Sequence, residues 1–183
     1  MSENLPADPG EEWRPGPDGI PWRAAARVLV LDAEGNILLL EGHDDDDGDH
    51  RWWFTIGGGI ATGEDARTGA VRELAEEAGF VVDPAELVGP VAKRSAIFRF
   101  ARRTVRQDEE FFVWRTDRVR PGISTAGWTE TEQDLLDQAR WFSATELEEL
   151  IAGGQTVYPL DLTDLLRAVQ PWDGRVRVLL EQV

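Results

Sequence analysis

The chain has 183 residues, of which 42% are hydrophobic and 30% charged, the composition of a folded soluble domain. Its 35 acidic residues against 19 Lys and Arg give a net charge of −16, so we expect no general affinity for nucleic acid or an anionic membrane. The absence of cysteine excludes disulfides and thiol chemistry. Apolar runs are too short to cross a bilayer, and the acidic N-terminus lacks secretory features, so we expect a cytoplasmic protein.

The chain divides by composition near residue 20. Residues 1–20 hold four of the ten prolines and are interpreted as a flexible N-terminal arm. Strand-like and helix-like patterns begin after this point and continue without an internal repeat. We therefore expect a single domain over residues 21–183.

The first half of this domain begins with strand patterns. Residues 26–31 and 37–40 are apolar and strand-like, and residues 32–36 have the turn composition of a hairpin. The acidic run in residues 42–50 is most simply a solvated loop; its acids and two histidines suit a cation, but nothing in the pattern fixes a ligand geometry. Residues 51–56 predict a third strand, which ends in three glycines.

The remaining patterns alternate between helix and strand. Residues 65–78 have the length and composition of a helix that Gly79 closes. Strands are expected at 87–92, 96–103 and 110–116, and short helices at 144–151 and 160–169. Together these elements predict an α+β fold, a mixed β-sheet with flanking helices.

Three glutamates lie close together on the helix expected at 65–78. Glu73, Glu76 and Glu77 are spaced i, i+3 and i+4, so they share one arc, while Val71, Leu74, Ala75 and Ala78 share another that can pack on a sheet. Clustered carboxylates suit a hard divalent ion, and the neighbouring Arg72 can hold one of them by a bidentate pair. The alternative is a charged surface helix whose glutamates face water.

The residues before this helix extend the pattern. Glu64 lies at or just before the helix start, and the glycines at 57–59 allow backbone to approach a ligand closely. The segment from Gly58 to Phe80 as a whole resembles the Nudix box, with every specified position met by Gly58, Glu64, Arg72, Glu73, Leu74, Glu76, Glu77, Gly79 and Phe80. Ile56 and Ala61 stand where many members have Pro and an acid.

The resemblance implies a fold and a chemistry. Members have an α/β/α sandwich around a mixed sheet and use divalent metal to cleave a diphosphate linkage in nucleoside diphosphate derivatives. It implies that Glu73, Glu76, Glu77 and the backbone at Gly58 hold Mg²⁺ or Mn²⁺, with Arg72 positioning a carboxylate and Glu64 completing the site or positioning water. The general base would be a box glutamate or Glu132, which lies where some members place an additional glutamate.

Two further groups are candidates for substrate binding. Residues 87–107 contain no acid but six cations, and we interpret Arg99 and Arg102 as a clamp for phosphate or ribose; the alternative is a solvated strand face paired with acids from elsewhere. Trp53 and Phe54 precede the glycine turn and can stack on a base, although strand alternation favours core packing for such residues.

The substrate stays open between ADP-ribose-type compounds, nucleoside triphosphates and dinucleoside polyphosphates. The resemblance implies a small-molecule nucleotide substrate and is compatible with a homodimer. A second hypothesis is a catalytically silent Nudix-fold nucleotide sensor. Such proteins tend to lose box carboxylates, whereas this chain keeps all four, which favours the enzyme.

Overall fold

One mixed β-sheet organises the protein. The computed structural model describes residues 13–44, 47–99 and 104–179, apart from the side chains of Asp47, Thr131 and Glu132. In these ranges the strands are β1 (Trp22–Leu31), β2 (Ile37–Asp44), β3 (Asp47–Gly59), β4 (Val88–Arg99), β5 (Thr104–Arg115), β6 (Leu136–Phe142), β7 (Thr156–Tyr158) and β8 (Arg177–Val178). The helices are α1 (Ala66–Ala78), α2 (Glu130–Leu135), α3 (Ala144–Ala152), α4 (Leu162–Ala168) and a 3₁₀ turn, η1 (Pro84–Glu86).

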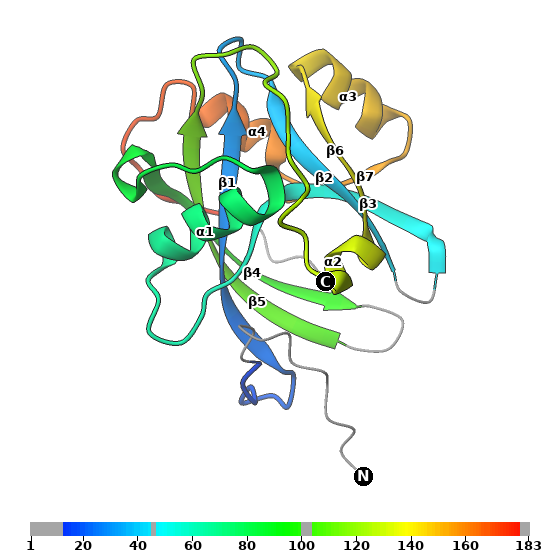
Figure 1. Cartoon of the computed structure of the whole chain (residues 1–183). Helices are drawn as coiled ribbons and strands as arrows, with labels where there is room; N and C mark the ends of the chain where they lie inside the picture. The colour runs from blue at the N-terminus through cyan, green and yellow to red at the C-terminus, as the bar shows by residue number, and fades with distance from the viewer. Residues whose placement is uncertain (1–12, 45–46, 100–103, 180–183) are drawn as a thin grey trace.

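The strands are ordered β6-β2-β3-β1-β5-β4-β8, and β7 pairs with β3 (Figure 1). The pairs β1–β5, β3–β7 and β4–β8 are parallel, whereas β1–β3, β2–β3, β2–β6 and β4–β5 are antiparallel. Because β3 lies between β2 and β1, the strand that enters the predicted box is in the interior of the sheet.

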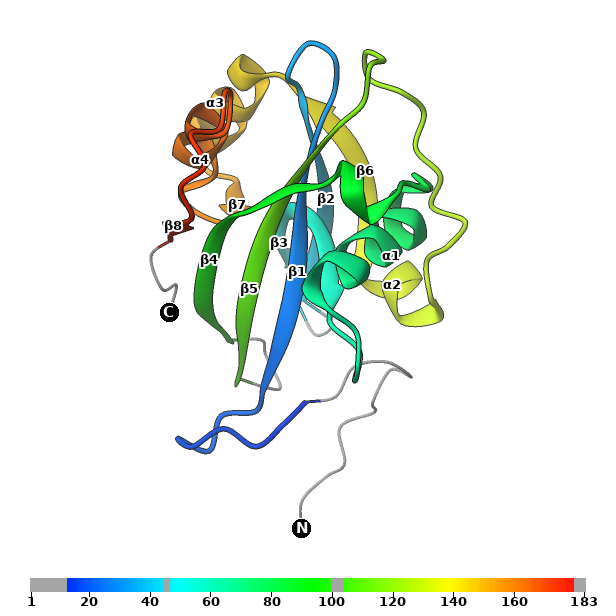
Figure 2. The same cartoon turned by 90° about the vertical axis from the view of Figure 1, so that its left-hand side faces the viewer.

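Helices cover both faces of the sheet. Figure 2 shows α1 and α2 on one side and α3 and α4 on the other. Leu74 and Ala78 of α1 pack on Val28 and Ile56 in one apolar core. In the other core, leucines of α3 and α4 pack on the opposite sheet face, together with Phe111, Leu29 and Phe142. The predicted α+β class and α/β/α sandwich are therefore confirmed.

The predicted turn between the first two strands is present. Asp32 Oδ1 accepts hydrogen bonds from Glu34 N and Asn36 N, both 2.9 Å, and Gly35 has a φ of 83°, which favours glycine. The strands then separate, because β1 and β2 pair only at Leu31 and Ile37 and β3 lies between them. The turn was predictable from neighbouring residues, whereas the position of β3 between the two strands was not.

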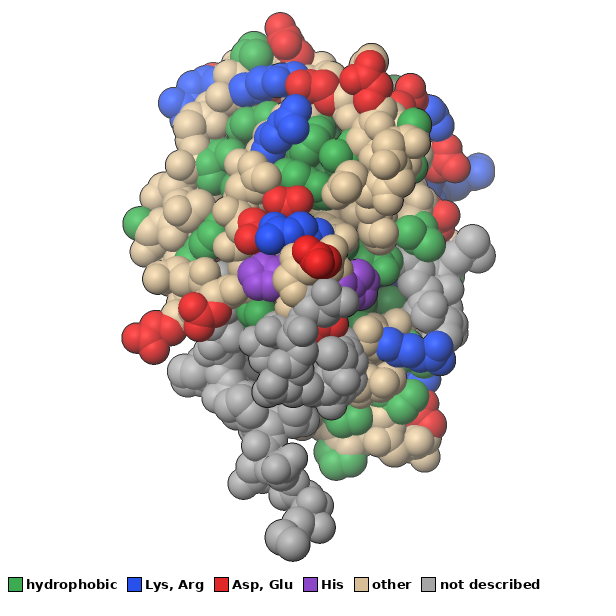
Figure 3. Space-filling view, turned by 90° about the vertical axis from the view of Figure 1, so that its right-hand side faces the viewer, with side chains coloured by type: hydrophobic (Ala, Val, Ile, Leu, Met, Phe, Trp, Pro, Cys, Tyr) green, Lys and Arg blue, Asp and Glu red, His purple; other side chains and the backbone are tan. Residues whose placement is uncertain are grey.

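The interpretation of residues 42–50 as a loop was wrong in its extent, since β2 continues to Asp44 and β3 begins at Asp47. Basic residues of these strands pair with a neighbouring strand: Arg51 Nη1 lies 2.7 Å from Asp137 Oδ2 of β6, which also lies 3.0 Å from His43 Nδ1. Figure 3 shows both histidines among acidic and basic side chains on this face. Asp45 and Asp46 lie outside the described residues.

The two strands predicted at 87–92 and 96–103 are one strand over most of this range. β4 pairs with β5 from Val88 opposite Val113 to Arg99 opposite Thr104. The polar residues in the middle suggested a break, but they follow the alternation of a strand, with Arg94 buried between exposed Lys93 and Ser95. Residues 100–103 lie outside the described part.

The N-terminal arm predicted at residues 1–20 is described only from Trp13 onward. There Arg14 forms an isolated antiparallel bridge with Trp22, and the Arg23 guanidinium lies 4.5 Å from the centre of the Trp13 ring. The boundaries of the arm and of the domain stay predictions. Among the described residues, no helix is long and apolar enough to span a membrane.

Candidate active site

Helix α1 carries the glutamates, and its ends are set by local sequence. Asp65 is the N-cap, and its side chain accepts hydrogen bonds from the backbone N–H groups of Arg67 (3.0 Å) and Thr68 (2.9 Å). Gly79 ends the helix in the left-handed conformation with φ 76°, and its N–H donates to the carbonyl of Ala75. The predicted helix is thus present within one residue at its start.

The helix presents two of its glutamates to the sheet. Glu73 and Glu77 are only 7% and 4% exposed and lie on the same face as Leu74 and Ala78. The sequence predicted that Val71 and Ala75 would pack on the sheet with Leu74 and Ala78. Both are only half-buried, so the buried face of α1 is rotated toward the two glutamates. Burying a carboxylate requires hydrogen-bond or ionic partners. Glu73 accepts a hydrogen bond from Arg72, and Glu77 accepts one from the glycine turn.

The Arg72 guanidinium is shared between three box carboxylates. Its Nε and Nη2 donate to the two oxygens of Glu64 at 3.1 and 3.0 Å, and its Nη1 donates to Glu73 Oε1 (2.8 Å) and Glu76 Oε2 (3.0 Å). A further hydrogen bond goes to the carbonyl of Gly59 at 2.8 Å. These hydrogen bonds with Glu64, and the charge of Glu73, raise the pKa of Arg72, although burial opposes the shift. A cation therefore already lies at the centre of the acidic cluster.

Glu64 is held as an anion. Burial disfavours its charged form, but the hydrogen bonds from Arg72 and from Ala61 N (3.0 Å) outweigh this effect and lower its pKa. Its carboxylate also explains a glycine inside α1. A Cβ added at Gly69 would lie 3.1 Å from Glu64 Oε2, so a larger residue there would push against the carboxylate.

The glycine turn contacts the helix through the two buried glutamates. Gly57 N donates to Glu77 Oε2 at 2.7 Å. A Cβ added at Gly58 would lie 2.8 Å from Glu73 Oε1, so Glu73 packs directly on the Gly58 backbone. Of the residues predicted to hold metal, Glu73 lies against Gly58, Glu77 contacts the adjacent Gly57, and Glu76 is joined to Glu73 through Arg72.

A loop that sequence analysis did not single out packs against the last turn of α1. Trp128 Nε1 donates to the carbonyl of Glu77 at 3.0 Å, which satisfies one of the helix's terminal acceptors. A Cβ added at Gly127 would lie 2.4 Å from the carbonyl oxygen of Glu76, so only glycine allows this approach. No local pattern marks either residue, because the contact joins segments 51 residues apart.

The donor set fits a hard divalent cation. Its members are carboxylate and backbone oxygens, and a Cβ-free turn brings Gly58 directly against Glu73. Across the described side chains, no three Asp, Glu or His groups are arranged as a cation site as they stand. The Arg72 guanidinium lies between Glu64, Glu73 and Glu76, and its positive charge neutralises part of their negative charge in this structure.

The two predicted aromatic residues have different environments. Trp53 is 3% exposed and packs edge-to-face on Phe142, with ring centres 4.8 Å apart, so it belongs to the core opposite α1. The packing alternative accounts for Trp53. Phe54 points to the α1 side and is half-buried, and the Arg27 guanidinium lies 5.8 Å from its ring centre.

The other predicted residues are not part of the cluster as described. Arg99 is exposed at the end of β4, and β5 and β1 separate that strand from β3 in the sheet. Arg102 lies outside the described residues. Glu132 belongs to α2, and its side chain also lies outside the described part. Their roles stay predictions.

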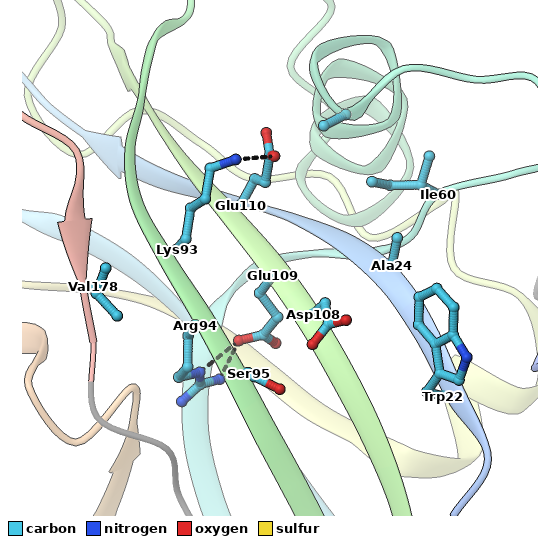
Figure 4. Close-up of a pocket in the computed structure, with 11 residues that line it drawn as sticks. Trp22, Ala24, Ile60, Lys93, Arg94, Ser95, Asp108, Glu109, Glu110 and Val178 are labelled. Atoms are coloured by element: carbon cyan, nitrogen blue, oxygen red, sulfur yellow. Dashed lines mark hydrogen bonds and ion pairs between the residues drawn. The ribbon is translucent and has the colours of Figure 1, made fainter. Parts of the chain in front are cut away.

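Several cations of residues 87–107 pair with acids. Lys93 Nζ lies 2.7 Å from Glu110 Oε1, Arg94 Nε donates to Glu109 Oε2 at 2.6 Å, and both pairs are visible in Figure 4. They border a cavity of about 450 Å³ beside the start of α1 (Figure 4), whose lining includes none of the predicted site residues. For these cations, pairing with acids from elsewhere is the interpretation that the structure supports.

Comparison with known proteins identifies relatives. A family model described as the NUDIX domain matches residues 21–160. A curated protein named RNA pyrophosphohydrolase from Dinoroseobacter shibae is 37% identical over 69 residues, 38% of this chain and 41% of the relative. Another of that name from Roseobacter denitrificans is 27% identical over 142 residues, 72% and 83% of the two chains. The chain therefore spans about two fifths of the length of the first relative.

Solved structures of low sequence identity share the fold. The MutT protein from Methanosarcina mazei Go1 aligns with a TM-score of 0.53 at 18% identity, covering 85% of this chain and 98% of its own. The E. coli dihydroneopterin triphosphate pyrophosphohydrolase gives 0.55 at 19% identity, with 80% and 94% covered. A NUDIX hydrolase from Alicyclobacillus acidocaldarius gives 0.56 at 14% identity, with 81% and 92% covered.

Proposed function

This chain belongs to the Nudix family, and from that premise we propose that it is a divalent-metal-dependent hydrolase that cleaves the diphosphate linkage of a nucleoside diphosphate derivative. The observation that carries the proposal is the acidic cluster on α1. Three box carboxylates converge on one guanidinium, and a fourth contacts the glycine turn.

Cleaving a phosphoanhydride requires neutralised phosphate oxygens and an aligned water. Glu73, Glu76, Glu77 and the backbone at Gly58 would hold Mg²⁺ or Mn²⁺, which when bound neutralises phosphate charge and lowers the pKa of water. A cation would compete with Arg72 for Glu73 and Glu76. The two hydrogen bonds from Arg72 to Glu64 keep the guanidinium beside the site during this exchange.

The box glutamates and Glu132 are the candidates for taking the proton of the attacking water. Glu64 is ionised and takes its hydrogen bonds from Arg72 and Ala61 N, which supports a role in orienting Arg72. Glu76 has the most exposed side chain of the four, at 46% against 12% for Glu64 and 9% for Glu73, so it is accessible to water and substrate. We assign the base to a box glutamate or to Glu132.

We propose a small-molecule nucleotide as substrate: an ADP-ribose-type compound, a nucleoside triphosphate or a dinucleoside polyphosphate. The net charge of −16 supports this choice over a long polyanion. The relatives named RNA pyrophosphohydrolase make the 5′ end of RNA a second candidate. The proposal includes substrate contacts from Phe54, Arg99 and Arg102, a cytoplasmic location and a homodimer.

A nucleotide panel tests the proposal. We expect wild type with Mg²⁺ or Mn²⁺ to release phosphate-containing products from at least one nucleoside diphosphate derivative. The panel includes a short 5′-triphosphorylated RNA. Glu76→Gln is expected to lower kcat by about 10²–10⁴-fold, the range for loss of a positioned acid or base. Glu149→Gln, on an exposed position of α3, serves as the matched control and is expected to retain activity.

The outcomes separate the hypotheses. Turnover in wild type and its loss in a folded Glu76→Gln variant support the enzyme. Nucleotide binding without turnover in wild type would instead support a silent sensor. Cleavage of the RNA alone would replace the small-molecule substrate by the RNA end.

A further inference from the structure

The buried arginine Arg27 contacts the glycine turn from the sheet face opposite α1. It lies on β1 directly opposite Gly57 in the antiparallel pair with β3. Its Nη1 donates to the carbonyl of Gly57 and, at 3.4 Å, to the carbonyl of Thr55. Arg27 is only 9% exposed, so these carbonyls contribute to the solvation that the buried cation needs.

Gly57 is therefore held from both sides. Its carbonyl accepts from Arg27, and its N–H donates to Glu77 Oε2 at 2.7 Å on the α1 side. Gly57 has a φ of 130°, and a Cβ added there would lie 2.1 Å from the carbonyl oxygen of Ala26. Only glycine fits, and glycine by itself leaves the backbone conformationally free. The contacts on both sides restrict it to one conformation.

Arg27 is itself fixed by acids and amides of β5. Its Nε donates to Glu109 Oε1 at 3.0 Å and its Nη2 to Gln107 Oε1 at 3.2 Å. The second oxygen of Glu109 accepts from Arg94 Nε at 2.6 Å, and the Glu109 side chain is fully buried. Figure 4 shows Arg94 reaching Glu109 across β4 and β5. A planar guanidinium with this many fixed partners has little freedom to move.

We propose that Arg27 is a positioning residue for the metal site: it fixes Gly57 so that the Gly57 N–H orients the buried carboxylate of Glu77. The inference rests on the proposed function, because it assigns Glu77 to metal. Groups that orient ligand side chains typically change metal affinity or activity by about 10–100-fold when they are removed. Arg27 itself touches neither metal nor substrate in this proposal.

The experiment compares Arg27→Met and Arg27→Lys with wild type. Mn²⁺ binding is measured by the loss of the free-ion EPR signal, independently of turnover, and kcat and KM are measured at saturating metal. We expect Arg27→Met to raise the Mn²⁺ dissociation constant by about 10–100-fold and to lower kcat, with KM within about twofold of wild type. Arg27→Lys keeps the charge, and its Mn²⁺ dissociation constant is expected to lie between those of wild type and Arg27→Met.

Arg115→Met is the matched control, since Arg115 lies at the exposed end of β5 and donates one hydrogen bond to the carbonyl of Val169 at 3.2 Å. It is expected to bind Mn²⁺ as wild type does. If Arg27→Met and Arg27→Lys lower only the melting temperature and bind Mn²⁺ with wild-type affinity, the positioning role is wrong. If Arg27→Met does not fold, Arg27→Lys alone decides by the same criterion. Wild type that binds Mn²⁺ but hydrolyses nothing in the panel would reject the proposed function and leave this test intact.

Discussion

The two faces of the sheet carry arginine–glutamate clusters of opposite balance. On the α1 face, Glu64, Glu73 and Glu76 share the Arg72 guanidinium, whose side chain is 34% exposed, and Glu77 contacts the glycine turn beside them. On the other face, Arg27 and Arg94 share a single glutamate, Glu109, and the exposed side-chain fractions of the three are 11%, 3% and 0%. The first cluster is acidic and opens to solvent at Glu76, whereas the second is basic and closed.

This difference indicates that the first cluster is suited to binding a ligand and the second to stabilising the fold. The carboxylates of the first cluster outnumber its arginine and one of them, Glu76, is exposed, so the cluster gains by taking up a further cation, which suits a metal site. A closed network whose hydrogen bonds are satisfied gains nothing from a ligand, but it loses much when one member is removed. Both clusters contact the glycine turn, so the closed network can stabilise the geometry of the open one.

The largest expected effect is on the closed network. Glu109→Gln removes the negative charge that the two buried guanidinium groups share, so we expect the free energy of unfolding to fall by about 3–5 kcal/mol. Urea denaturation of the metal-free protein measures this change. Glu110→Gln is the matched control, because Glu110 is the next residue of β5 and forms an exposed pair with Lys93; its effect is expected to stay below about 1 kcal/mol. Equal effects of the two variants would show that the buried network contributes no more than a surface pair.

A smaller effect is expected at the loop that packs on α1. Trp128→Phe removes the indole N–H that donates to the carbonyl of Glu77, and we expect a loss of about 1 kcal/mol in thermal unfolding. Activity should also fall, since the same helical turn carries Glu76 and Glu77. Trp172→Phe provides the control, because the Trp172 indole donates to the carbonyl of Arg175 in an exposed turn. A loss of activity in both variants would contradict a local effect on α1.

The smallest expected effect is the pH dependence from Glu64. Its pKa in the folded protein is below the ordinary 4.5, because the hydrogen bonds from Arg72 outweigh burial. Protonation is therefore harder in the folded state, so this contribution is present above pH 4.5 and is lost as pH falls through the folded pKa. The melting temperature in EDTA should therefore fall as the pH is lowered below 4.5. We expect a shallower fall in Glu64→Gln than in Glu149→Gln; identical slopes would contradict the assignment.

The site was predictable from sequence to the extent that it is local. The spacing of Glu73, Glu76 and Glu77 predicted an acidic cluster, and Asp65 and Gly79 bound its helix because capping depends on neighbouring residues. The rotation of the buried face of α1 was not predictable in this way. Glu73 and Glu77 are buried where Arg72 and the glycine turn supply hydrogen-bond partners to them, and those partners come from outside the local pattern of α1.

The sequence by itself determined the family motif, the hairpin turn and the ends of α1, since all of these depend on residues within a few positions of one another. Only the tertiary structure decided that β3 lies between β1 and β2, that Arg94 is buried within one continuous strand, and that Arg27 lies opposite Gly57. These features join residues as far apart as Arg27 and Glu109, and a sequence does not show which distant charges will neutralise each other.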